Sequence, residues 1–543
     1  MAEPAKAARP APADNDERNV GARELLVGQA ANELVVAVVG HVGSGTSEIA
    51  ELVANLLEDI GGFETTIVKA RREIEEWARA NGKPVPADRD RLETTQALQD
   101  LGDAMRAQTS DFASVGEAIA ARIRVLRAEK QAVVIEGSEP VVPDGTPRAY
   151  VVDAIRHPAE VEVLRHIYQD AFVLIGVVCD EDVRITRITR KYENAGRAAA
   201  EALMKCDAKR GPKNGQRVSD AFHMSDFFVD NSEPRLLENG EGNSDWNVNE
   251  KLTRLLKIVS HSEVIRPSIA ETAMHHAYSA SMRSACLSRQ VGAALIDDAG
   301  NVIATGTNEA PRAGGGVYGE LFADEGSDHR CAFSNKYCSN TVQQNEIATR
   351  IVDNIPALKS LPPEEKAAIS VQLRDTDIGD LIEFSRAVHA EMDALLSAAR
   401  AGTSTVGTRL YVTTFPCHYC ARHIVSAGVD EVQFIEPYPK SKALSLHKDS
   451  IETVASRWSS PSDVRLKTKV GDDDTHPKVL FRPFVGVAPR MYRRAFLKMR
   501  ELKDKTTGKM DIGNPEWGTS WHLRAAGYAE LEAQIANRGN KGG

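Results

Sequence analysis

Residues 409–436 read RLYVTTFPCHYCARHIVSAGVDEVQFIE and decide the fold of the second half of the chain. We expect a strand over Arg409–Thr413, a helix over Cys417–Ala427 and a strand over Glu431–Ile435, a succession typical of an α/β sheet. Earlier elements of the same sheet are predicted as helices over Ile269–Ser288 and Val388–Arg400, strands over Val291–Ile296 and Val302–Thr307, and a long polar insert over Asn308–Gly379. One sheet with helices packed on it is the predicted fold here.

The same stretch carries two cysteines at metal-ligand spacing. Cys417 and Cys420 lie three positions apart, so in a first helical turn both side chains face the same side. A helix N-terminus carries partial positive charge and favours thiolates. Upstream, His389 and Glu391 stand two positions apart. HAE at 389–391 and PCHYC at 416–420 together resemble the signature of zinc deaminases.

One imidazole and two thiolates leave the fourth tetrahedral position of Zn²⁺ open to water, as catalysis requires. We therefore predict His389 and the two cysteines as metal ligands and Glu391 as the catalytic acid and base. Zinc activates a water, and Glu391 moves its proton to ring N3 while C4 is attacked and ammonia leaves. The alternatives are a closed zinc knuckle, with His418 or His423 as a fourth ligand, or unrelated core cysteines beside a surface histidine.

Around this site the chain resembles the deoxycytidylate deaminase branch of the cytidine deaminase superfamily. The resemblance rests on RQVGAALI at 289–296, ATGTNEAP at 304–311, HAE at 389–391 and TTFPCHYC at 413–420 with AGV at 427–429. These pieces span about residues 262–440. The resemblance implies an α/β/α deaminase fold, a zinc-dependent hydrolase of cytosine nucleotides and a homo-oligomer.

The same resemblance implies substrate contacts. Asn308 is carried over as a contact to the sugar, although Asn also commonly caps turns. Arg289 and Arg312 are candidate phosphate contacts, because Arg suits bidentate phosphate recognition. Past the last strand, Lys440 and Lys442 are candidates for binding a polyphosphate, and a solvated basic loop is the competing interpretation.

The insert also carries candidate ligands for a second metal ion. His329, Cys331 and Cys338 lie within it, and related deaminases can carry a structural zinc in such an insert. Free thiols are the alternative that a reducing compartment favours.

In the first half of the chain, GHVGSGTS at 40–47 follows an apolar strand over Leu34–Val39 and opens a helix over Ser47–Leu57. A loop in that position cradles phosphate with backbone N–H groups and the helix dipole. Thr46 stands where a P-loop carries Lys, which argues against ATP hydrolysis, whereas Ser47 can still coordinate Mg²⁺. The candidate nucleotide-binding residues are Gly40, Gly43, Ser44, Gly45, Thr46 and Ser47.

Further strands are expected over Ala132–Ile135, Tyr150–Val152 and Phe172–Cys179, alternating with helical patterns. This alternation predicts a parallel sheet covered on both faces. DAIRHPAEVEVLR at 153–165, the arginines at 184, 187 and 190, and DFFVDN at 226–231 resemble nucleoside and nucleotide kinases. The resemblance implies a P-loop nucleotide-kinase-like domain that binds a regulatory nucleotide; a relic fold used for assembly is the alternative.

We expect a disordered lead over 1–28, the P-loop domain over 29–258, the deaminase domain over 259–470 and a C-terminal extension over 471–543. This fusion resembles the bacterial anti-phage dCTP/dCMP deaminases. That resemblance implies depletion of deoxycytidine nucleotides during infection, with a partner RNA holding some members inactive beforehand.

Bulk properties disfavour several other classes. Among 543 residues the formal net charge is -10 and 6% are aromatic, which disfavours a polynucleotide-editing deaminase with a basic groove and aromatic platforms. Seven scattered cysteines and the lack of a long apolar run predict a cytoplasmic protein without disulfides or a membrane partner. A housekeeping dCMP deaminase and a nucleotide sensor with an idle deaminase are the remaining alternatives.

Overall fold

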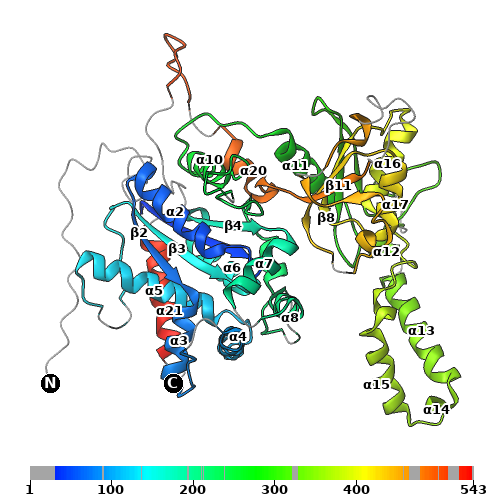
Figure 1. The fold of residues 1–543 in the computed structure, drawn as a ribbon, viewed down its shortest axis with the longest axis horizontal. Coiled ribbons are helices and arrows are strands. Elements are labelled where there is room, and N and C mark those ends of the chain that lie inside the picture. The colour runs from blue at the N-terminus through cyan, green and yellow to red at the C-terminus, as the bar shows by residue number, and fades with distance from the viewer. Residues whose placement is uncertain are drawn as a thin grey trace.

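The computed structural model describes residues 31–540 except 88–90, 136, 138, 193–194, 209–210, 212, 238, 321–327, 335, 439, 456–457, 464–476, 499–500 and 512–524. The lead expected over 1–28 lies outside the described residues. Two α/β bodies stand side by side, and a helical hairpin projects from the second (Figure 1). Among the described residues, no helix combines the length and the apolar character that a membrane span needs.

The first body is built on a six-stranded sheet in the order β12-β5-β4-β1-β3-β2. Its strands are β1 (Glu33–Gly40), β2 (Glu64–Lys69), β3 (Arg148–Ile155), β4 (Phe172–Val178), β5 (Phe227–Asp230) and β12 (Gly486–Val487). β12 runs antiparallel to β5, and the other neighbours pair in parallel. The parallel sheet predicted for this part is confirmed.

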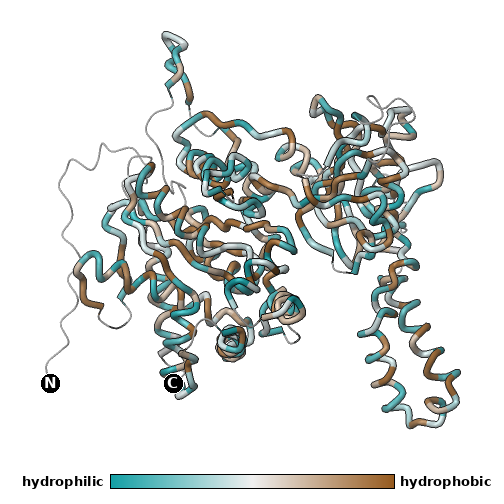
Figure 2. Tube along the Cα trace, viewed as in Figure 1, coloured by the Kyte–Doolittle hydropathy of each residue, from teal (hydrophilic) through white to brown (hydrophobic). Residues whose placement is uncertain are grey.

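β1 explains why this sheet is buried on both faces. Every residue of β1 is buried, and alternate side chains enter different cores. Leu34, Val36 and Val38 share a core with α2 (Thr46–Gly61) and α10 (Val248–Ser260). The intervening side chains pack with α5 (Ser114–Gln131) and α6 (Pro158–Tyr168) on the opposite face. The continuous apolar run, brown in Figure 2, is what a doubly covered strand requires.

One expected strand is wrong. Ala132–Ile135 follows α5 as a turn and an irregular segment, and β2 pairs with β3 at that edge of the sheet instead. Ala132 takes a left-handed φ of 53° and ends α5. Val134 is consequently 81% exposed. A short apolar run does not by itself distinguish a strand from other structure.

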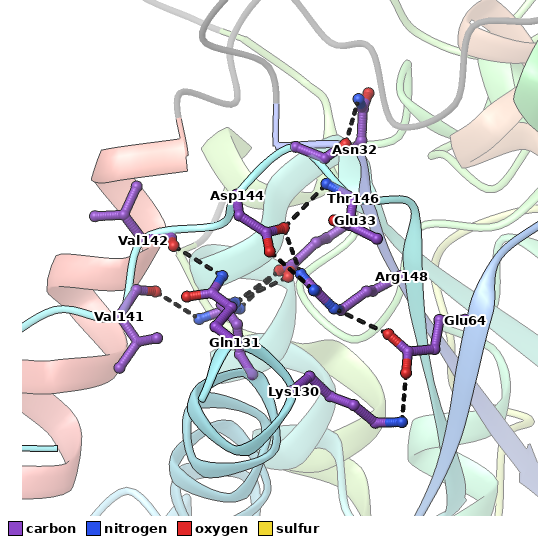
Figure 3. A network of polar contacts seen from close by, with 12 residues as sticks. Asn32, Glu33, Glu64, Lys130, Gln131, Val141, Val142, Asp144, Thr146 and Arg148 are labelled. Atoms are coloured by element: carbon purple, nitrogen blue, oxygen red, sulfur yellow. Dashed lines mark hydrogen bonds and ion pairs between the residues drawn. The ribbon is translucent and has the colours of Figure 1, made fainter. Parts of the chain in front are cut away.

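Hydrogen bonds and ion pairs hold the loop between α5 and β3 in place (Figure 3). Gln131 Nε2 donates to the Val142 carbonyl at 3.0 Å, and Arg148 on β3 makes a bidentate pair with Asp144 at 2.6 and 2.9 Å. Hydrogen bonds from Arg148 hold the pKa of Asp144 well below its usual range. Arg148 also reaches Glu64 on β2 at 3.3 Å, so the loop is fastened to the edge of the sheet.

The second body is a six-stranded sheet in the order β10-β11-β9-β8-β6-β7. Its strands are β6 (Gly292–Ile296), β7 (Val302–Thr307), β8 (Arg409–Thr414), β9 (Glu431–Glu436), β10 (Ile451–Glu452) and β11 (Val479–Pro483). β6 runs antiparallel to β7 and β8, and the remaining neighbours are parallel. The sequence predicted the four strands within residues 291–436, whereas their order in the sheet comes from the structure.

Helices cover both faces of the second sheet. α11 (Ile269–Ser281) packs on one face, and α16 (Ala390–Arg400) and α17 (His418–Ser426) share a core with the other. Two glycines allow close approach, because a Cβ on Gly292 would lie 1.9 Å from the Ala277 carbonyl of α11. A Cβ on Gly306 would lie 2.1 Å from the Ala390 carbonyl of α16. The result is the predicted α/β/α arrangement.

A short segment joins the two sheets. β11 pairs with β9 in the second sheet, and within three residues β12 pairs with β5 in the first. Between them, the N–H of buried Phe484 donates to the Phe434 carbonyl at 2.8 Å. The Val487 N–H donates to Glu271 Oε1 at 2.8 Å, and Glu271 also pairs with Arg254 of α10 at 2.7 Å. Residues assigned to a C-terminal extension therefore contribute strands to both bodies.

The insert forms a helical hairpin that projects from the second body (Figure 1). Its helices are α13 (Ser339–Asn354), α14 (Pro356–Lys359) and α15 (Pro363–Arg374). Ala348 and Val352 of α13 are buried, whereas α15 has no buried residue. The hairpin therefore has only a thin internal core.

A buried ion network attaches the last helix, α21 (Ala525–Asn540), to the first body. Arg127 of α5 is fully buried between Glu33 of β1 at 2.8 Å and Glu532 of α21 at 2.5 Å. The Tyr168 hydroxyl donates to Glu532 and the Tyr528 hydroxyl to Glu33, at 2.6 and 2.7 Å. A buried charge persists only when it is paired and hydrogen-bonded, as these are.

We expect Arg127→Leu to destabilise the protein by about 3–5 kcal/mol, because two buried carboxylates would lose their counter-charge. Urea unfolding of the full chain, followed by tryptophan fluorescence, measures this free energy. Arg122→Leu on the same helix is the control; its partly exposed pair with Glu129 at 3.8 Å is worth less than about 1 kcal/mol. Equal stability of the two variants would contradict a stabilising role for the network.

Candidate metal centre and active site

Two helix N-termini bring the predicted metal ligands together. Cys417 is the N-cap of α17, where its sulfur accepts from the Cys420 N–H at 3.4 Å, and His389 is the N-cap of α16. His389 Nδ1 lies 3.3 Å from Cys417 Sγ and 3.4 Å from Cys420 Sγ. Zinc bonds of about 2.0–2.3 Å in a tetrahedron separate ligand atoms by about 3.5 Å, so the donor set and its spacing fit Zn²⁺.

Within the part of the chain that the structure describes, these three residues form the one cluster of His, Cys, Asp or Glu whose ligand atoms all lie within 4.8 Å. His418 and His423 do not join it. The His418 ring instead packs against the Tyr419 ring, with centroids 4.8 Å apart. A closed knuckle with four protein ligands therefore has no support among the described residues.

The shifted pKa values in this cluster suit Cys417 to binding a metal and Glu391 to carrying a proton. The pKa of Cys417 falls to about 4, because the Cys420 thiol and the His389 ring hydrogen-bond to its sulfur. Glu391, in the first turn of α16, is only 4% exposed. Burial, reinforced by the neighbouring Cys417, raises the pKa of Glu391 to about 7.

A cavity of about 380 Å³ opens from this cluster. His389, Glu391 and Cys417 line it, together with the predicted substrate residues Asn308, Arg289 and Lys440. Arg312 and Lys442 are outside its lining. The structure thus gathers three of the five predicted substrate residues around the metal ligands.

Asn308 is nearly buried, and its amide is engaged with backbone. Its Oδ1 accepts from the Val291 N–H at 2.7 Å, and its Nδ2 donates to the Arg289 carbonyl at 2.7 Å. The amide therefore shapes the cavity wall by joining the end of β7 to the segment before β6. The Arg289 side chain pairs with Glu436 at 3.2 Å.

The other three predicted phosphate-binding residues, Arg312, Lys440 and Lys442, contact neighbouring protein groups. Arg312 donates to the Gly315 carbonyl at 3.0 Å within its own glycine-rich turn. Lys440 pairs with Asp380 at 2.8 Å, and exposed Lys442 lies 3.9 Å from Asp377. Both aspartates belong to the turn that follows α15, so the basic loop contacts the insert.

Sequence reasoning missed several residues of the cavity. Arg374, Asn340 and Gln344 come from the insert, Arg386 lies between the insert and His389, and Tyr438 follows β9. The insert was predicted as a polar segment with His329, Cys331 and Cys338 as candidates for a second metal site, and nothing in its local pattern marks which of its residues reach the cavity.

Cys331 and Cys338 carry no disulfide and also line this cavity. The His329 ring packs against Tyr318 with centroids 5.2 Å apart. Among the described residues, these three do not form a metal-binding cluster. The free-thiol alternative therefore fits the structure.

The glycine-rich loop of the first body lies between β1 and α2, as expected. Gly40 ends β1, and Thr46 begins α2. Gly43 and Gly45 take φ of 85° and 87°, a left-handed conformation that favours glycine. The Ser44 carbonyl accepts from Asn231 Nδ2 at 3.0 Å, which fixes the loop to the end of β5.

Two carboxylates frame this loop. Ser47 Oγ donates to Asp153 at the end of β3, at 2.9 Å, a pair suited to holding Mg²⁺. The Val42 N–H donates to buried Asp207 at 2.7 Å, so an internal carboxylate already uses one N–H of the loop. A second cavity, of about 330 Å³, is lined by Val42, Ser47, Asp153 and Arg156 among others.

Comparison with known proteins identifies the family that the second body resembles. Residues 267–436 match the model of the cytidine and deoxycytidylate deaminase zinc-binding region. Over 175 residues the chain is 32% identical to the deoxycytidylate deaminase of Enterobacteria phage T2, which covers 32% of this chain and 82% of the phage protein. The dCMP deaminase structure of cyanophage S-TIM5 is 21% identical with a TM-score of 0.20, covering 34% of this chain and 94% of that one.

The chain is also 28% identical over 204 residues to a UPF0200 protein of Aeropyrum pernix, and the match covers 37% of this chain and 86% of that protein.

An α/β/α domain with an open His-Cys-Cys centre and a buried glutamate beside it defines the class of zinc-type deaminases. Through residues 267–436 the chain belongs to the cytidine and deoxycytidylate deaminase family.

We expect Cys417→Ala to purify without zinc, since two remaining ligands do not make a tetrahedral site. Atomic emission measures zinc per chain in the full-length protein. Cys206→Ala, on α8 (Arg197–Ala208) of the first body, is the control and keeps one zinc per chain. Full zinc occupancy in the Cys417 variant would rule out the ligand assignment.

Proposed function

We propose that the chain hydrolyses the exocyclic amine of free deoxycytidine nucleotides, dCMP, dCTP or both, to the uracil nucleotide and ammonia. The observation that carries this proposal is Glu391, a buried carboxylate that lines the cavity two residues from a metal ligand. Family membership and the name of the phage T2 relative support dCMP as a substrate.

The roles of the residues follow from their positions. When bound by His389, Cys417 and Cys420, zinc supplies a Lewis acid that makes a water nucleophile available near neutral pH. Glu391 takes a proton from the attacking water and delivers it to ring N3 as the new C–O bond forms at C4. It then takes the proton of the new C4 hydroxyl and passes it to the departing amine, so the C4–N bond breaks, the C4 carbonyl forms and ammonia leaves.

The shape of the cavity favours a free nucleotide over a polynucleotide. Its volume of about 380 Å³ lies in the range of small-molecule sites. The insert supplies one of its walls through Asn340, Gln344 and Arg374. Phe415 and Tyr438 line it as well and offer apolar surface to a pyrimidine ring.

We expect Glu391→Gln to keep its zinc and to lose about 10²–10⁴-fold in turnover, because the proton carrier is removed. Chromatography of uracil products from dCMP, dCTP and an oligonucleotide measures the activity. Glu346→Gln, on the exposed face of α13, is the control and keeps wild-type turnover.

No turnover of any mononucleotide by the zinc-loaded wild type would overturn the proposal. Deamination of the oligonucleotide alone would favour an editing enzyme.

We further infer that the first body regulates the deaminase through nucleotide binding at Gly40–Ser47. Asn231 joins the loop to the end of β5, which pairs with β12. The chain from β12 leads back into β11 beside β9, and Glu436 at the end of β9 pairs with Arg289 in the cavity. A rearrangement of the loop therefore has a continuous route to the active site.

We expect Ser47→Ala to weaken binding of Mg²⁺-nucleotide and to remove any effect of that nucleotide on the deamination rate, because the hydroxyl is the candidate metal contact. Equilibrium binding of ATP and GTP, in parallel with deaminase assays, tests both parts. Thr186→Ala, on exposed α7 (Glu181–Lys191), is the control. A rate that responds equally to nucleotide in both variants would exclude the loop as regulator.

The resemblance to anti-phage deaminases supports a cellular role in depleting deoxycytidine nucleotides during infection. We propose in addition a cytoplasmic homo-oligomer whose activity a partner RNA restrains. A housekeeping dCMP deaminase is the competing role. Infection of cells carrying the wild-type or Glu391→Gln protein, with nucleotide pools measured, separates the two.

A further inference from the structure

Helices α7 and α8 form an arm that packs on the glycine-rich loop of the first body. The arm has a small core of its own, made of the buried residues Ile185, Ile188, Tyr192, Ala200, Leu203 and Met204. Val42 of the loop packs against this core, and a Cβ on Gly43 would lie 2.9 Å from the Arg184 carbonyl of the arm. Among the described residues, this core includes no residue of the sheet, so the arm is able to leave the loop while the sheet stays packed.

One carboxylate joins the arm to the loop. Asp207, near the end of α8, is only 1% exposed. Its Oδ2 accepts from the Val42 N–H at 2.7 Å, and its Oδ1 accepts from Arg156 Nη1 at 3.0 Å. Arg156 directly follows β3 and also donates to the Gly40 carbonyl at 2.9 Å, which holds its guanidinium against the loop. An internal carboxylate thus occupies a backbone N–H and a guanidinium, two kinds of donor that bind phosphate.

The position of Asp207 suits a phosphate group. Because Thr46 stands where a P-loop carries Lys, the cation for the phosphates has to come from another residue, and Arg156 is the guanidinium held at the loop. Arg184 is close enough to Asp207 to oppose the rise that burial causes in the pKa of this carboxyl. Among the described residues, the buried Nε of Arg184 has no hydrogen-bond partner. Both oxygens of Asp207 are engaged, whereas a terminal phosphate offers three.

We propose that Asp207 is an internal competitor of nucleotide, and that nucleotide phosphates bound at the loop displace it and release the arm of α7 and α8. The inference rests on the nucleotide binding proposed above for Gly40–Ser47 and describes how that site is regulated. While Asp207 is docked, only molecules with a released arm are competent to bind, and the apparent affinity falls by that fraction. Asp207 therefore sets the nucleotide concentration to which the first body responds.

The first test measures binding of Mg²⁺-ATP and Mg²⁺-GTP to the full-length protein. We expect Asp207→Asn to bind nucleotide at least about tenfold more tightly than the wild type, because losing a charged hydrogen bond in the competitor raises the competent fraction. Asp182→Asn is the matched control and keeps the wild-type affinity. It removes the same charge from α7, where exposed Asp182 pairs with Arg197 within the arm at 3.0 Å.

A second test needs no substitution. Cys206 precedes Asp207 on α8 and is half-buried, with its sulfur 3.6 Å from Gln99 Oε1. Alkylation of Cys206 by iodoacetamide, followed by peptide mass spectrometry, reports local opening of the arm. We expect saturating nucleotide to increase this rate several-fold in the wild type. In Asp207→Asn the rate is already high before nucleotide is added.

Tighter binding by Asp207→Asn, without a response of Cys206 to bound nucleotide in the wild type, would mean that Asp207 acts through its charge alone and is not displaced. Equal affinity of the wild type and Asp207→Asn would also overturn the inference, while leaving the loop as a nucleotide site. No binding to either protein would overturn the regulatory role of the loop as well. Circular dichroism confirms that each variant is folded, and deaminase assays on the same samples test the catalytic proposal separately.

Discussion

The approach of two helix N-termini at one end of the second sheet is the constraint on which the active site depends. α16 can lie close to β7 only because Gly306 has no side chain at the contact. That approach sets His389 within 3.4 Å of both cysteine sulfurs, since all three ligands occupy the starts of α16 and α17. The same turn of α16 buries Glu391 beside them. Metal binding and proton transfer therefore share one backbone arrangement.

The joining segment makes two separate α/β bodies into one molecule. β11 and β12 belong to different sheets, and only Phe484 and Val485 lie between them. Glu271 reinforces the joint by accepting from Val487 and pairing with Arg254. Helix α11 of the second body is thus tied to helix α10 of the first body. The regulation proposed above would pass through this joint.

The insert adds a wall to the cavity beside the candidate metal ligands. The core of the fold supplies the cluster of His389, Cys417 and Cys420 and the buried Glu391, whereas the insert supplies a polar wall of the cavity through Asn340, Gln344 and Arg374. The candidate metal ligands and this wall of the cavity therefore come from different parts of the chain. Loops and insertions on a rigid scaffold commonly carry binding residues.

The sequence by itself identified the residues that cluster at 389, 391, 417 and 420, the glycine-rich loop and most strands, because each has a local signal of spacing or apolar pattern. Only the tertiary structure placed β11 and β12 in different sheets, brought Glu532 against Arg127, and set Arg374 and Arg386 at the cavity. Those contacts join residues distant in the chain, and no local pattern encodes a partner hundreds of positions away. The expected strand over Ala132–Ile135 failed for the same reason: the edge of the sheet was taken by β2, a competition that only packing decides.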